Sequence, residues 1–159
     1  STIHSGTTSG TFARLINMDI EPFLLASTII GVLGVRLLRT NCMHCTVPYT
    51  PEPYALEQLR QFEGDEYLQA LLDQQGFYKG NGCSACSDTG YGSRSSINEL
   101  LVCDEGVREA VMQKKASRDI QTIAVETGMR TLWTSGLQMV VDRKTTLEET
   151  LMKVAADQV

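Results

Sequence analysis

Two Cys-x-x-Cys pairs, Cys42 with Cys45 and Cys83 with Cys86, are the residues in this sequence whose spacing most clearly suggests chemistry. A turn of this kind brings two thiolates to the separation that tetrahedral zinc requires, so two such turns supply a complete set of four ligands. Four sulfur ligands leave no open position for a substrate. The pattern therefore predicts a structural zinc site.

The surroundings of the second pair suit such a site, because Gly80, Gly82, Gly90 and Gly92 flank it. Glycine lets the backbone curl so that its N–H groups can point at sulfur. The spacer between the pairs is longer than in a compact zinc ribbon and has room for two helices. Closing so long a loop costs entropy, and a bound metal would offset that cost. We therefore expect zinc to hold the base of a helical insertion.

Other chemistry remains open for the same four cysteines. Two disulfides would need an oxidising compartment, a redox dithiol usually has one such pair at a helix start, and sulfur ligands also hold iron–sulfur clusters. His44 lies within the first pair and is expected to face solvent. Cys103 follows an apolar strand and is expected to be a small buried hydrophobic residue.

Hydrophobic periodicity and turn residues predict the elements that position these cysteines. Ser1 to His4 resembles the end of a strand, which suggests a fragment of a larger protein. A helix starting at Pro22 and reaching about residue 33 is expected to be buried nearly all round, and a strand at 35–39 leads to Cys42. The other expected elements are helices at 9–18, 52–62, 66–74, 104–116, 117–126, 131–143 and 147–156, and strands at 76–80 and 94–102. Together they predict an α+β fold that is mostly helical.

Composition limits the functions that fit. The chain has 159 residues, 42% of them hydrophobic and 21% charged, which indicates a folded chain. Its net charge of −5 and its scattered basic residues argue against nucleic acid as a partner. The stretch without charge at 22–35 is shorter than the roughly 20 residues that cross a bilayer, so direct membrane insertion is not expected.

Several motifs in fixed order resemble the type II secretion and type IV pilus assembly ATPases, from end to end of the chain. The matching segments are residues 1–4, 14–24 (RLINMDIEPFL), 31–39 (GVLGVRLLR), 42–45, 48–49, 82–86, 89–91, 97–101 (INELL), 128–132 (GMRTL), 136–137 and 145–149 (TTLEE). The chain departs from the usual family residues at Ser5-Gly6, at Val35 and at Gly92-Ser93.

The resemblance implies the C-terminal portion of a hexameric RecA-like motor, located in the cytoplasm and peripheral to the bacterial inner membrane. Its partners would be further copies of the motor and the inner-membrane platform proteins of the secretion or pilus machinery. It implies three segments: residues 1–41 end the ATPase core, residues 42–91 form the zinc subdomain, and residues 92–159 hold a returning strand and a C-terminal helical bundle.

Two residues gain candidate roles from this resemblance. His4 matches the histidine of the family's His box, near the γ-phosphate, and Arg94 matches an arginine near the nucleotide or a subunit interface. The phosphate-loop pattern Gly-x-x-x-x-Gly-Lys-Ser/Thr does not occur in the sequence. ATP and Mg²⁺ would therefore be bound only in the intact parent protein, and this chain alone is expected to be inactive.

Two other functional classes remain as alternatives. A stand-alone, zinc-stabilised protein-interaction module would also carry about one zinc per chain. A thiol oxidoreductase would instead show reversible dithiol oxidation without metal. Whether the parent motor serves secretion or pilus assembly does not follow from these residues.

Overall fold

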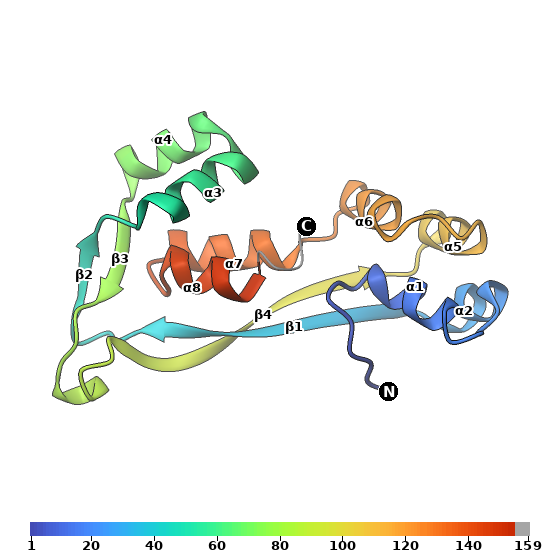
Figure 1. The fold of residues 1–159 in the computed structure, drawn as a ribbon, viewed down its shortest axis with the longest axis horizontal. Helices are drawn as coiled ribbons and strands as arrows, with labels where there is room; N and C mark the ends of the chain where they lie inside the picture. The colour runs from blue at the N-terminus through green and yellow to red at the C-terminus, as the bar shows by residue number, and fades with distance from the viewer. Residues whose placement is uncertain (155–159) are drawn as a thin grey trace. The chain divides into compact units, whose positions relative to one another are not determined.

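The computed structural model describes residues 1–154, which form an α+β fold in which helix exceeds strand (Figure 1). The elements in order are α1 (Gly10–Ile16), α2 (Pro22–Thr28), β1 (Gly31–Asn41), β2 (Thr46–Tyr49), α3 (Pro53–Glu63), α4 (Asp65–Gln74), β3 (Phe77–Gly80), a 3₁₀ turn (Ser84–Cys86), β4 (Tyr91–Val102), α5 (Glu105–Met112), α6 (Ser117–Glu126), α7 (Leu132–Val141) and α8 (Leu147–Val154). Strand β1 pairs with β4, and β2 pairs with β3.

The chain divides into two compact units. The first consists of residues 1–35 and 98–132, and the second of residues 36–97 and the described part of 133–159. Helices α5 and α6 therefore belong to the first unit, and α8 belongs to the second. That all C-terminal helices form one bundle is not confirmed, and the segment boundaries at 41 and 91, which rest on sequence motifs, stay predictions.

The first unit packs α2 against α5, α5 against α6, and α1 against α6. Its core is formed by Phe12, Leu25, Ala26, Leu101, Cys103, Val107, Ala110, Val111, Ile120 and Ala124. Cys103 is 5% exposed, which confirms the prediction that it is a small buried hydrophobic residue.

The second unit contains the insertion that separates the two cysteine pairs. Strands β2 and β3 are antiparallel with Thr46 opposite Gly80 and Tyr49 opposite Phe77, and the helices α3 and α4 lie between them in the chain (Figure 1). Helix α3 packs on α4 and also on α8. At its end, the Trp133 indole Nε1–H donates to Glu63 Oε1 at 2.6 Å, and the Trp133 ring meets Phe62 edge to face.

Three predictions near the N-terminus were wrong. Residues 1–4 form no strand in the structure. The helix that starts at Pro22 ends at Thr28, because Ile29 adopts an extended backbone and β1 begins at Gly31. Nor is this helix buried all round, since Phe23 is 55% exposed. A continuous apolar run suits both a buried helix and a strand, so periodicity alone does not separate them.

The helix ends are set by local chemistry. The Asp104 carboxylate accepts the Val107 N–H at 2.9 Å, as an N-cap at that position predicts. Helix α6 spans Ser117–Glu126 as predicted, and its N-cap residue Ala116 makes no side-chain hydrogen bond. Helix α5 stops at Met112, before the predicted residue 116, and Lys114 takes a left-handed conformation with φ 54°. The predicted end of the last helix, at residue 156, lies outside the described residues.

Within residues 1–154, the structure contains no helix that combines the length and apolar character needed to cross a bilayer.

Candidate metal centre

The first cysteine pair lies in a tight turn between β1 and β2. The Cys45 N–H donates to the Cys42 carbonyl at 3.2 Å, and the Thr46 hydroxyl donates to the same carbonyl at 2.7 Å. Cys42 is buried and Cys45 is half-buried. Both thiols of the first pair therefore lie in the turn that directly follows β1. Met43 and His44, between the two cysteines, are exposed, as expected for His44.

The second pair lies in the short turn between β3 and β4, where backbone amides face sulfur. The N–H groups of Cys83 and Gly90 each donate to Cys86 Sγ at 3.3 Å. The chain curls back there because Ser87 and Asp88 both adopt left-handed backbone conformations, with φ values of 51° and 60°. This is the amide-to-sulfur arrangement that the glycine-rich sequence predicts.

Two glycines allow this turn to close. A Cβ atom on Gly80 would lie 1.8 Å from the Gly90 carbonyl oxygen, and one on Gly90 would lie 2.4 Å from the Gly80 carbonyl oxygen. Gly90 also has φ 76°, a conformation that side chains other than glycine rarely adopt. The two backbones therefore touch where no side chain fits.

Backbone hydrogen bonds join the two cysteine turns. The Cys42 N–H donates to the Gly90 carbonyl at 2.8 Å, and the Asn81 N–H donates to the Cys45 carbonyl at 2.9 Å. Since β2 and β3 continue from this junction, the cysteines lie at the base of the helical insertion, as the long spacer predicts.

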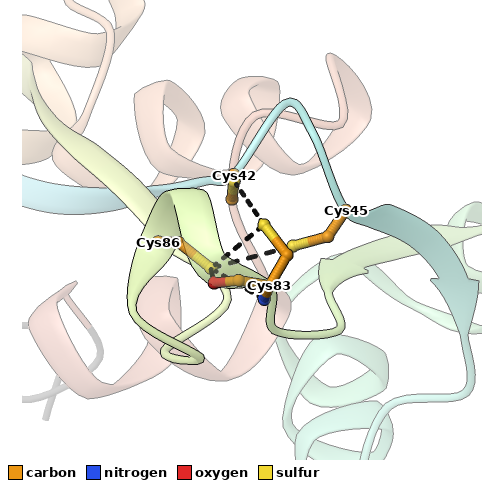
Figure 2. Close-up of side chains that lie close together, drawn as sticks. All are labelled: Cys42, Cys45, Cys83 and Cys86. Atoms are coloured by element: carbon orange, nitrogen blue, oxygen red, sulfur yellow. Dashed lines mark hydrogen bonds between the residues drawn. The ribbon is translucent and has the colours of Figure 1, made fainter.

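The four sulfurs meet at one place, as Figure 2 shows, and the Sγ atoms all lie within 4.8 Å of one another. The Sγ–Sγ distances are 3.9 Å for Cys42–Cys83, 3.9 Å for Cys45–Cys86 and 3.7 Å for Cys83–Cys86. Sulfurs bonded to tetrahedral zinc at about 2.3 Å would be separated by about 3.8 Å. All five cysteines of the chain are free thiols in the described structure. The site therefore fits a metal ion and contains no disulfide.

The pKa values of two thiols in the cluster are shifted in opposite directions. Burial raises the pKa of the Cys45 thiol to about 11, and hydrogen bonds with the neighbouring thiols add to the rise. Burial acts in the same direction on Cys86, but hydrogen bonds from the backbone N–H groups of Cys83 and Gly90 outweigh it and lower the Cys86 pKa to about 7. Four thiolates this close together repel one another, so their joint ionisation requires a bound cation.

The two residues matched to nucleotide contacts lie in different parts of the fold. His4 is exposed in the irregular segment before α1, in the first unit. Arg94 is exposed on β4, in the second unit. Neither belongs to the cysteine cluster.

Sequence reasoning missed an ion pair between the half-exposed Arg39 side chain and the buried carboxylate of Glu149. Glu149 on α8 is 2% exposed, and its carboxylate accepts the Arg39 backbone N–H at 3.0 Å and the Arg39 Nε–H at 2.8 Å. The Thr146 hydroxyl accepts the Glu149 N–H at 3.1 Å, which is one half of a capping box, while the Glu149 carboxylate turns to β1 instead of completing it. Its partner is 110 residues away in sequence, so local patterns give no signal for the pair.

This pair predicts an acid-dependent contribution to stability. Burial raises the pKa of Glu149, but the hydrogen bonds from the Arg39 side chain and backbone outweigh it and hold the pKa below its ordinary value. The stabilisation is thus complete above the unfolded-state pKa of about 4.3 and is lost as pH falls through the lower folded-state pKa. We expect Glu149→Gln to lower the free energy of unfolding by about 2 kcal/mol at pH 7.

Urea unfolding of the wild type and of Glu149→Gln from pH 7 to pH 3 measures this pH dependence. The quantity compared is the difference between their free energies of unfolding, because any release of metal at low pH affects both proteins equally. The difference should shrink as pH falls below about 4. Glu66→Gln, at an exposed position of the same unit, serves as the control and should change stability by no more than about 0.5 kcal/mol. A difference between wild type and Glu149→Gln that is independent of pH would contradict this role of the carboxylate.

Comparison with known proteins matches the chain to a family profile and to relatives that are named for type II secretion or type IV pilus assembly. The profile of the family described as "Type II/IV secretion system protein" matches residues 1–152. The chain is similar to the Type IV pilus assembly ATPase PilB of Thermus thermophilus, with 38% identity over 153 residues, which is 96% of this chain and 16% of that protein. It is also similar to the Type II secretion system protein HxcR of Pseudomonas aeruginosa (34% identity, covering 99% of this chain and 28% of that protein) and to the Type II secretion system protein E of Aeromonas hydrophila (36%, 99% and 30%).

The chain spans between 16% and 30% of the length of these three relatives. Activities and partners named for the whole relatives therefore involve much sequence beyond the matched part.

Proposed function

Because the chain belongs to the family of type II/IV secretion system proteins, we propose that it is part of a motor ATPase that powers type II secretion or type IV pilus assembly. The observation that carries this proposal is the match over residues 1–152, which includes both cysteine pairs and the motif order around them. Relatives named for pilus assembly and for secretion match the chain about equally well, so the proposal covers both systems.

Within such a motor, we assign the chain a structural task. Residues 1–41 end the RecA-like core, residues 42–91 form the zinc subdomain, and residues 92–159 return to the core and complete the C-terminal helices. Cys42, Cys45, Cys83 and Cys86 hold one zinc ion, whose four sulfur ligands leave no position for substrate. The metal keeps the bases of β2 and β3 together and so fixes the insertion formed by α3 and α4.

ATP and Mg²⁺ are bound by parts of the motor outside this chain. A phosphate loop supplies the backbone N–H groups and the lysine that hold the β- and γ-phosphates, and that motif does not occur in the sequence. His4 would lie near the γ-phosphate, where a neutral imidazole can position water or donate a hydrogen bond. Arg94 would face the nucleotide or a neighbouring subunit, where its guanidinium would balance phosphate charge.

The assembly that we propose is a homo-hexamer in the cytoplasm, on the inner face of the bacterial inner membrane. Its partners there are the platform proteins of the secretion or pilus machinery. Nucleic acid is not among them, in keeping with the net charge of −5.

A chimera tests the proposal. Residues 1–152 of this chain replace the matched segment of the Thermus thermophilus protein, and steady-state ATP hydrolysis of the purified assembly is measured. We expect the chimera to hydrolyse ATP and the isolated chain to show no turnover. In the chimera, His4→Ala should lower kcat by about 100-fold or more, the lower end of the usual contribution of a positioned side chain that assists proton transfer.

Met43→Ala is the matched control, because Met43 is 86% exposed and has no proposed role, and it should leave kcat unchanged. A chimera that assembles and binds zinc but does not hydrolyse ATP would contradict the proposal. Turnover by the isolated chain would contradict the assignment of ATP binding to the rest of the motor.

A further inference from the structure

A buried carboxylate in the first unit has no part in the proposed function as described so far. Glu99 on β4 is 3% exposed, and its Oε1 atom accepts the Thr8 N–H at 3.3 Å and the Thr8 hydroxyl. Its Oε2 atom accepts the N–H of Leu132, the first residue of α7, at 3.1 Å. Both oxygens are thus used, and they join two segments that are distant in sequence.

A glycine on β1, the strand paired with β4, leaves space for the Thr8 side chain. A Cβ atom on Gly34 of β1 would lie 3.0 Å from Thr8 Cγ2 and 3.7 Å from the Glu99 carbonyl oxygen. Thr8 is 2% exposed, so its methyl group fills the space above this glycine while its hydroxyl points to the carboxylate. We call the set Thr8, Gly34, Glu99 and Leu132 the Glu99 clasp.

The clasp anchors the segment that leads into α1. Ser9 is also buried, and α1 follows at Gly10, whose N–H donates to the Thr7 hydroxyl at 3.0 Å. The Thr11 N–H donates to the Thr8 carbonyl at 3.2 Å. Residues 1–6, in contrast, are exposed or half-buried and form no helix or strand. Thr8 is therefore the first residue of the chain with a fully buried side chain.

The hydrogen bonds to the Glu99 carboxylate are typical of a group that fixes the position of its partners. A buried carboxylate is costly unless donors satisfy it, and here two backbone N–H groups and one hydroxyl do so. Hydrogen bonds to a charged group contribute more to the free energy of folding than bonds between neutral groups, and they impose a direction on each donor. Glu99 thereby fixes both the position and the orientation of Thr8.

We propose that Glu99 is a positioning residue, which acts through Thr8 to set where the segment bearing His4 leaves the fold. His4 lies four positions before Thr8, so the clasp limits the region that its imidazole can reach. The importance of His4 for ATP hydrolysis rests on the proposed function, whereas the clasp itself does not.

The chain offers a built-in control for the test. It contains two histidines, His4 and His44, and His44 lies in the first cysteine turn of the other unit. NMR of the whole zinc-loaded chain can follow both imidazole signals together with backbone amide exchange. The variants are Thr8→Val, which removes only the hydroxyl donor, Thr8→Ser, which keeps it, and Glu99→Gln, which keeps the size of the side chain and removes its charge.

We expect Thr8→Val and Glu99→Gln to accelerate exchange at the amides of residues 8, 10 and 11 by about 10- to 100-fold, the scale of a lost hydrogen bond to a charged group. The His4 signal should shift or sharpen, and the His44 signal should stay unchanged. Thr8→Ser should keep exchange within about threefold of wild type, because the hydroxyl is retained.

Three results would overturn the inference. The first is that Thr8→Val has the same amide exchange rates and the same His4 imidazole signal as the wild type. Another is Thr8→Ser behaving like Thr8→Val, which would mean that the methyl group and not the hydroxyl holds the segment. The third is an equal change at His44, which would indicate general loosening. None of these measurements involves ATP, so a result against the Glu99 clasp is distinguishable from a result against the proposed function. An inactive chimera would contradict the proposed function and would leave the clasp intact.

Discussion

Replacing Cys83 with serine is expected to reduce the zinc bound per purified chain from about one equivalent to near zero. The hydroxyl of serine does not ionise at neutral pH, so one of the four ligands is lost. The second turn then has nothing to balance the charge on Cys86, whose sulfur accepts two backbone N–H groups. Since structural zinc contributes folding free energy directly, we expect the midpoint of thermal unfolding of the cysteine-bearing unit to fall by more than about 10 °C.

Inductively coupled plasma mass spectrometry and thermal unfolding measure the two effects. Cys103→Ala is the matched control, because Cys103 is a buried thiol of the other unit and lies outside the cluster. It should keep a full equivalent of zinc and lower stability by about 1 kcal/mol. Unchanged metal content and unchanged stability in Cys83→Ser would show that the cluster is not a metal site.

Gly80→Ala is expected to disrupt the same centre without touching a sulfur atom. The added Cβ would lie 1.8 Å from the Gly90 carbonyl oxygen, far inside van der Waals contact, and the atom that it meets is backbone and cannot rotate away. That carbonyl accepts the Cys42 N–H, and the Gly90 N–H donates to Cys86 Sγ. Moving Gly90 therefore displaces both cysteine turns. We expect a loss of about 3 kcal/mol or more in stability and weaker retention of zinc.

The variant Gly92→Ala provides the comparison. Gly92 lies near the same centre, but a Cβ there would be 3.4 Å from Cys42 Cα, which is an ordinary contact. Competition with a chelator of known zinc affinity, together with urea unfolding, should place Gly92→Ala within about 1 kcal/mol of wild type. Equal behaviour of the two variants would contradict the close backbone contact between Gly80 and Gly90.

The cysteine cluster was predictable from sequence because the information that specifies each of its turns is local. Each Cys-x-x-Cys turn specifies its own geometry, and the glycines around Cys83 and Cys86 mark a backbone that curls tightly. The two helices of the spacer also appear at the predicted places, since α3 and α4 have clear apolar faces. What the sequence left open was whether the two turns meet, and the structure brings all four sulfurs together.

The anchors of the fold were not predictable, because their information is not local. Glu99 meets Thr8 at a separation of 91 residues, and Glu149 meets Arg39 at a separation of 110. In a linear sequence, Glu99 is simply a polar residue on a strand and Glu149 is a residue of a capping box. Their roles follow only from burial, which makes an unpaired carboxylate costly.

The misassigned helix after Pro22 has a similar cause. Residues 29–33 are apolar and suit either a buried helix or a strand. The outcome is decided by pairing between β1 and β4, which are separated in sequence by the whole insertion. The backbone N–H of Cys103 donates to the Ile30 carbonyl at 3.0 Å, a partner that no local window contains.

X-ray absorption spectroscopy of the purified chain at the zinc edge, combined with metal analysis, shows whether one zinc ion holds the base of the insertion together. We expect about one zinc per chain, bound by four sulfur atoms at about 2.3 Å. A folded chain without stoichiometric zinc, or zinc bound by nitrogen and oxygen in place of sulfur, would rule out the proposed four-sulfur site.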